Sequence, residues 1–227
     1  MTTETLHHHV HFSLRDDRLI DLISVVLISL ATLMTAWCSY QSSSWGSLQA
    51  KRYAEANELR IKAASEEDAA HTRTAIDVSL FVQYLSARSA EHSQFADFLR
   101  AHFPDELKKA TDEWEATHPE TNPSAPSSPF TMPSFKVDAQ ERADRFNQIA
   151  NEAFMNGLHA NQHSDDYVLV TVLFASVSFL GGIGGKLRYP FHLVLLAFGA
   201  LLLVLAFGML TRLPATPIKP LIAEFKY

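Results

Sequence analysis

Apolar residues in this chain gather in three long blocks, and most charged residues lie between them. The blocks cover residues 19–40, 167–185 and 192–210. A bilayer core of about 30 Å is crossed by about 20 residues of α-helix, because each residue advances the helix by about 1.5 Å. The pattern therefore predicts three transmembrane helices.

The first block is better explained as a membrane span than as a cleaved signal peptide. Its apolar run begins only after 18 residues, and these include Glu4, Asp16 and Asp17, which suit the basic start of a signal peptide poorly. Trp37 and Tyr40 near its end are typical of aromatic anchors at a membrane surface. We expect this block to stay in the mature protein.

The polar segments complete the predicted organisation, an all-α integral membrane protein with a helical-hairpin, coiled-coil-like domain between its first two spans. Five segments flank or join the spans: a His-containing tail (1–18), a helical stalk (41–116), a Pro-rich loop (117–135), a second helical stalk (136–166) and a C-terminal tail (211–227). We expect the stalk helices to continue into the first and second spans, and the Pro-rich loop to be extended and exposed.

The stalk before the Pro-rich loop has the composition of a long helix. It is rich in Ala, Glu, Lys, Arg and Leu, and Lys51/Glu55 and Glu58/Lys62 are opposite charges four residues apart. No glycine or proline interrupts residues 47–103. Ser65, followed by three acids, resembles a helix start, so we expect a bend there.

Residues 76–87 are apolar almost all round the predicted helix, although they include Asp77 and Gln83. Such a helix is buried on more than one side, and a second copy of the chain would supply the extra burial. In the alternative monomer, the Pro-rich loop and a short helix from Pro104 to about Thr117 fold over this surface. The same apolar side continues through Phe95, Phe98, Leu99 and Phe103.

Two further patterns concern helix packing. After a helix start at Asp138, an amphipathic stripe runs directly toward the second span through Phe146, Ile149, Ala153, Phe154, Gly157 and Leu158. Within the second span, small residues share one side: Ala175, Ser178, Gly182 and Gly185. Small residues let another membrane helix approach closely, so this side is predicted to be a packing surface.

Charge sets the expected orientation and excludes some partners. Arg15, Arg18, Lys186 and Arg188 lie beside spans on one side, which favours a cytoplasmic N-terminus and an extracytoplasmic segment 41–166. The net charge is -6, without a basic stripe among aromatics, so no nucleic-acid partner is expected. The single cysteine excludes an intrachain disulfide framework.

Candidate chemistry is sparse and confined to histidines. Two groups are spaced so that they could bind a metal: His7, His8, His9 and His11 near the N-terminus, and His159 and His163 one helical turn apart. A solvated polar tail and an exposed stalk are the competing, plainer explanations. No pattern of catalytic residues and no nucleotide or cofactor motif is present, so we expect a protein that is not an enzyme and holds no cofactor.

These features favour a membrane-anchored helical scaffold or interaction protein that associates with itself and has a possible protein partner. One alternative is an extracytoplasmic ligand sensor that signals through a partner. Another is an oligomeric channel subunit, although the second and third spans have few polar side chains to line a pore.

The layout also resembles a family of bacterial membrane proteins of unknown function (DUF4337). The matching pieces are residues 6–11, 30–33, 45–51 and 186–188, which stand for the polar His-containing start, the first span, the stalk and the basic loop between two close spans. The Pro-rich loop departs from that layout. The resemblance implies a membrane protein with the same order of segments, and it implies no activity.

Overall fold

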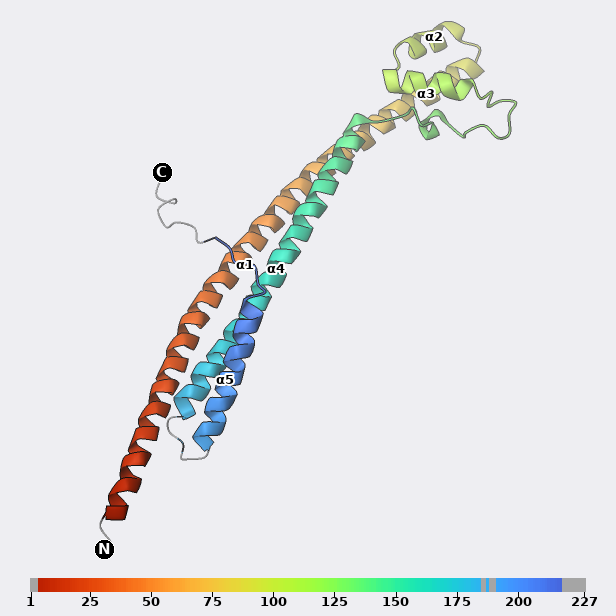
Figure 1. Ribbon diagram of the computed structural model, residues 1–227. Coiled ribbons are helices and arrows are strands. Elements are labelled where there is room, and N and C mark those ends of the chain that lie inside the picture. The colour runs from red at the N-terminus through yellow and green to blue at the C-terminus, as the bar shows by residue number, and fades with distance from the viewer. Residues whose placement is uncertain (1–3, 185–186, 188–190, 218–227) are drawn as a thin grey trace, which may run out of the picture. The chain divides into compact units, whose positions relative to one another are not determined.

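Every regular element that the structure describes is helical. The computed structural model describes residues 4–184, 187 and 191–217, with side chains from residue 21 onward. The elements are α1 (Glu4–Ser89), α2 (Ser93–Ala101), α3 (Asp105–Glu115), the 3-10 helix η1 (Pro129–Thr131), α4 (Asp138–Gly184) and α5 (Phe191–Leu210) (Figure 1). The predicted all-α class is confirmed.

Three of these helices are long and apolar enough to cross a membrane: α1, α4 and α5. In α1 and α4 the apolar stretch and a polar stretch belong to one uninterrupted helix, which confirms that the stalks continue into the first two apolar blocks. The helix start expected at Ser65 is wrong, because α1 passes through it. Good helix formers on both sides keep the helix intact there.

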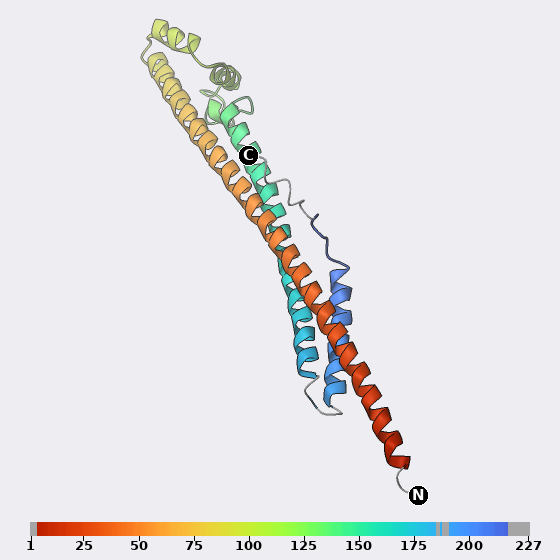
Figure 2. The ribbon, with the colours of Figure 1, turned by 90° about the vertical axis from the view of Figure 1, so that its left-hand side faces the viewer.

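The chain divides into two compact units, and the first comprises Met1–Arg52 with Met155–Tyr227. Within it, α1, α4 and α5 share one buried apolar cluster, and α4 and α5 lie side by side (Figures 1 and 2). Phe174 of α4 and Phe207 of α5 meet edge to face, with their ring centroids 5.3 Å apart. The fully buried members are Ala31, Cys38, Tyr167, Val170, Phe174, Val177 and Ala206.

Gly181 of α4 lies close to Ile28 of α1. A Cβ atom added to Gly181 would lie 2.7 Å from Ile28 Cγ1, which is too short for a normal contact. The small-residue side predicted from the sequence is different: Ala175 and Gly182 are exposed, and Gly185 lies outside the described residues. A Cβ at Gly182 would meet no atom of the described residues within 4 Å.

The second unit is Tyr53–Phe154, and α1 pairs with α4 along much of it. Glu66 accepts two hydrogen bonds from Arg142, at 2.8 and 3.0 Å, and Asn147 donates one to Glu67. The buried positions of this pair are mostly alanines, which lack the bulk that would hold the two helices apart. They are Ala56, Ala63 and Ala70 on α1, and Ala139, Ala143, Ala150 and Ala153 on α4.

Helix α1 ends at a turn that has no clear marker in the sequence. His92 N–H donates to Ala87 O and Glu91 N–H donates to Arg88 O, the bond pattern of a Schellman motif. Glu91 takes the left-handed backbone conformation, with φ of 57°, where glycine is usual. The apolar side predicted to continue from α1 is therefore interrupted: Phe95, Phe98 and Leu99 lie in α2, and Phe103 follows it.

Beyond this turn, α2, α3 and the Pro-rich loop cover one face of α1. Phe81 contacts Trp114 of α3 and Phe130 of the loop edge to face, with centroids 5.5 and 5.7 Å apart. Trp114 also donates a hydrogen bond to Pro126 O. The Pro-rich loop was expected to be extended and exposed, and residues 120–124 are exposed. The expectation is wrong for the later part of the loop, where Pro129 is buried and Phe130 packs on the core, because burying an aromatic side chain away from water is favourable.

The close approach at Gly181 yields a test of packing in the first unit. Replacing Gly181→Val should lower the free energy of unfolding by about 1–3 kcal/mol, because the added atoms overlap Ile28. Gly182→Val, one residue along, should have little effect. The measurement is the unfolding midpoint of the detergent-purified protein. If Ile28→Ala does not restore part of the loss in Gly181→Val, the proposed contact is not the cause.

Candidate functional site

The most developed polar site lies in the second unit, where α1, α2 and α3 meet. Glu115 stands at its centre: it accepts hydrogen bonds from Tyr84 Oη at 2.8 Å, Arg88 Nη1 at 2.8 Å and Arg100 Nη1 at 2.7 Å. Arg100 also contacts Asp112 at 2.5 Å. The core formed by Phe81, Tyr84, Leu99, Phe103, Leu107 and Trp114 holds these groups in place.

The polar groups of this network are paired with one another. Burial, together with the hydrogen bond to Glu115, raises the pKa of Tyr84, so the hydroxyl remains a neutral donor at ordinary pH. Two guanidinium groups balance the carboxylates of Glu115 and Asp112. Because each of these charges has a partner, the arrangement stabilises the junction of α1, α2 and α3.

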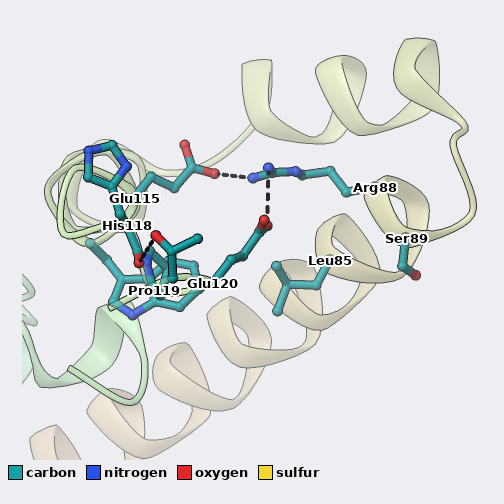
Figure 3. A pocket seen from close by; sticks show the side chains of 9 residues that line it. Leu85, Arg88, Ser89, Glu115, His118, Pro119 and Glu120 are labelled. Carbon is teal, nitrogen blue, oxygen red and sulfur yellow. Dashed lines mark hydrogen bonds and ion pairs between the residues drawn. The ribbon is translucent and has the colours of Figure 1, made fainter. Parts of the chain in front are cut away.

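An open pocket of about 600 Å³ adjoins the network (Figure 3). Arg88 reaches across it to Glu115 and, at 3.6 Å, to Glu120. The wall opposite α1 is the turn after α3, where His118 has a φ of 52°. The pocket is large enough for a small molecule, but an internal ion pair already occupies its charged groups.

A second pocket of about 300 Å³ is lined from three elements of the same unit. Asp77 comes from α1, Glu106 from the first turn of α3, and Asp138 from the first turn of α4. Basic residues complete the lining: Arg73, Lys136 and Arg142. The pocket thus has three acids and three bases among its lining residues.

Asp77 is the unusual group of this pocket. It is only 2% exposed, and its Oδ1 atom has no hydrogen-bond partner among the described residues. Its other oxygen lies 3.6 Å from Arg73 Nε, which is longer than a hydrogen bond. Burial raises the pKa of Asp77, Arg73 opposes this, and the neighbouring Glu106 adds to it.

The burial of Asp77 could have been predicted from the spacing of residues along the sequence. Ala56, Ala63, Ala70 and Asp77 follow one another at intervals of seven residues. Residues at this spacing return to the same side of a helix, so the burial of the three alanines implies that of Asp77. From the sequence, Asp77 stood out only as a polar residue within the apolar stretch 76–87.

A separate polar cluster in the first unit fixes the segment that follows α5. Gln41 is fully buried; its Oε1 accepts hydrogen bonds from the backbone N–H and hydroxyl of Thr216, and its Nε2 donates to Thr216 O. Pro214 O accepts from Trp45 Nε1 at 3.1 Å and from Tyr167 Oη at 3.3 Å. These contacts satisfy backbone groups of Pro214 and Thr216 beside the apolar helices.

The histidines singled out from the sequence are not brought into a metal centre in the described part of the chain. The side chains of His7, His8, His9 and His11 lie outside the described residues. His159 is exposed, whereas the ring of His163 packs on Trp45, with centroids 4.7 Å apart. Among the described residues, no group of three His, Cys, Asp or Glu side chains could hold a metal ion.

Comparison with known proteins adds no assignment: no protein-family model, no curated protein and no solved structure matches this chain. The resemblance in layout to a family of unknown function therefore stays a prediction.

The buried carboxylate gives a pH-dependent prediction. Because the pKa of Asp77 is higher in the folded than in the unfolded protein, the folded state binds the proton more tightly. The free energy of unfolding should therefore fall as pH rises from the ordinary value of 3.8 through the raised pKa, and this component should be absent from Asp77→Asn.

The measurement is denaturant unfolding of the wild-type protein and Asp77→Asn between about pH 4 and 7. The difference between them should shift with pH in favour of the variant. Asp97→Asn, which removes an exposed acid on α2, is the matched control for the loss of one carboxylate. A difference that moves the other way, or does not move, would contradict the assignment.

Proposed function

We propose that the chain is a non-enzymatic membrane protein, anchored by α1, α4 and α5, that acts as a scaffold and associates with itself through its helices. The apolar composition of the three helices supports the anchoring. The polar network of the second unit supports a structural role, since its charges are paired with one another and not presented to a substrate.

A row of exposed apolar side chains on α1 carries the self-association. Val78, Val82 and Leu85 are 39%, 57% and 37% exposed, in a part of the helix that also bears polar residues. Their spacing of four and three residues puts them on one face. We call this row the outer face. Burying side chains of this size contributes about 1.5–3 kcal/mol each when burial is complete.

The other side of this stretch of α1 is covered by other parts of the same chain. The alternative in which the Pro-rich loop and a short helix fold over the apolar surface therefore holds for this side. Phe81 and Tyr84 are 5% and 3% exposed, because α2, α3 and the Pro-rich loop pack against them. Phe81 is therefore part of the protomer's own core, so a substitution there would disturb the fold of a single chain. Val82 on the outer face is exposed and is the better probe of association.

A ligand sensor is a second candidate. The two pockets of the second unit favour it, since one of them holds a buried carboxylate oxygen that has no partner among the residues the structure describes. The described chain contains no output module, so a sensor of this kind would signal through another protein.

We further propose that the protein lies in a bacterial inner membrane with its N-terminus in the cytoplasm and residues 41–166 outside. Basic residues beside spans favour the cytoplasmic side. Arg15, Arg18, Lys186 and Arg188 lie on the side assigned to the cytoplasm, and Arg212 lies close to a span on the other.

Self-association predicts a mass that is a multiple of 25.4 kDa. Light scattering of the purified protein at micromolar concentration, with the detergent mass subtracted, measures it. Val82→Asp should lower the mass toward that of one chain, because a carboxylate on the outer face would have to be desolvated. Gln83→Asp, whose side chain points about 100° away on the helix, should leave it unchanged. A wild-type mass near 25.4 kDa would refute self-association.

The topology can be tested with the chain's single thiol removed. In a Cys38→Ala background, Ser127→Cys and Leu187→Cys each introduce one exposed thiol. A membrane-impermeant thiol reagent added to intact cells should label the first variant and spare the second. After the cells are broken open, both should react. Labelling of the second variant alone in intact cells would reverse the proposed orientation.

A further inference from the structure

The pocket around Asp77 combines features of a binding site for a positively charged nitrogen. It is a cavity of about 300 Å³ with a buried carboxylate in its lining. One oxygen of that carboxylate has no hydrogen-bond partner in the described part of the chain. A buried acceptor without a donor is costly, so a group that supplies an N–H to this atom would be stabilised there.

The charges already present in the pocket do not supply that donor. Arg142 directs two hydrogen bonds to Glu66, and Lys136 lies 3.7 Å from Glu141. Arg73 approaches Asp77 only at 3.6 Å and on the other oxygen. Arg142 and Lys136 thus interact with other acids, and Arg73 is too far from Asp77 to donate a hydrogen bond to it.

A second acid strengthens the negative side of the pocket. Glu106, from the first turn of α3, has no ion-pair or hydrogen-bond partner among the described residues and interacts unfavourably with the charge on Asp77. A cation placed between these two carboxylates would relieve their repulsion. No group of three metal-binding side chains is present in the described chain, which favours an organic cation over a metal ion.

We propose that this pocket binds a protonated primary amine, whose ammonium group is held between the carboxylates of Asp77 and Glu106. An ammonium carries three donors and one positive charge, which matches two acid neighbours better than a neutral donor does. The amine can belong to a simple alkylamine or to an amino acid. In an amino acid, the carboxylate would lie toward the basic rim formed by Arg73 and Lys136.

The inference does not depend on the proposed self-association. Asp77 lies on a different side of α1 from Val82, because five residues turn a helix by about 500°. Asp77→Asn is therefore expected to lose amine binding without changing the oligomeric mass, and Val82→Asp is expected to do the reverse.

The test is calorimetric titration of the full-length, detergent-purified protein with four probes. Propylamine and L-alanine represent the two sources of the ammonium group. Tetramethylammonium has the charge without an N–H donor, and propionate has only the anion. Binding of propylamine assigns a simple amine, and binding of L-alanine alone assigns an amino acid. Either result supports the proposal, provided that tetramethylammonium and propionate do not bind.

Variants connect the binding to the pocket. Asp77→Asn keeps the shape of the side chain and should weaken binding at least tenfold. Glu106→Gln alters an exposed residue, so it should fold normally and also weaken binding, whereas Asp97→Asn on α2 should bind as the wild type does. The proposal is overturned if neither amine binds with a Kd below about 1 mM, or if binding survives unchanged in both pocket variants.

Discussion

Close packing of α1 against α4 through alanine side chains is the constraint on which the second unit depends. Ala56, Ala63 and Ala70 are at most 3% exposed, and Ala143 and Ala150 of α4 are fully buried. Alanine occupies little space beyond the backbone, so two helices that meet through it can lie closer than helices separated by leucine. Each alanine contact stabilises the pairing only slightly. The stabilisation adds up because dispersion and apolar burial contribute along the whole length over which the two helices pack.

The same pairing positions the groups that are chemically unusual. The seven-residue spacing that places the three alanines on the buried side of α1 also places Asp77 there. The N-terminus of α4 contributes Asp138 to the pocket that Asp77 lines. A carboxylate at this depth is destabilising unless it is neutralised or given a partner. Asp77 stands in a row whose other members are small apolar residues. This buried carboxylate makes the pocket a candidate for ligand binding and not merely a packing defect.

The sequence allowed the long helices to be predicted well, because their signals are local. Three apolar blocks indicated three apolar helices, and the amphipathic stripe after Asp138 showed that α4 continues from stalk into apolar block. The end of α1 could not be read in this way. Its Schellman turn places Glu91, and not a glycine, in the left-handed conformation, so the usual marker is missing.

The remaining errors concern contacts between distant residues. Nothing near Trp114 in the sequence indicates that its indole would bond Pro126 or that Phe130 would cover Phe81. Likewise, a row of small residues on one side of the second block did not reveal that Gly181, one position away from that row, makes the close contact with Ile28. Such contacts depend on which helix lies opposite, and one sequence does not specify it.

The pairing of α1 with α4 inside one chain can be measured most directly by thiol cross-linking. In a Cys38→Ala background, Glu66→Cys and Arg142→Cys replace two residues whose side-chain ends, Glu66 Oε2 and Arg142 Nη2, are 2.8 Å apart. Cysteine is shorter than either side chain, so a short linker that reacts with two thiols, and not a direct disulfide, should join them within a single chain. Glu66→Cys with Asp144→Cys, on the other side of α4, should not be joined. Cross-links that form only between two chains would contradict the account, because α1 would then be paired with α4 of another copy.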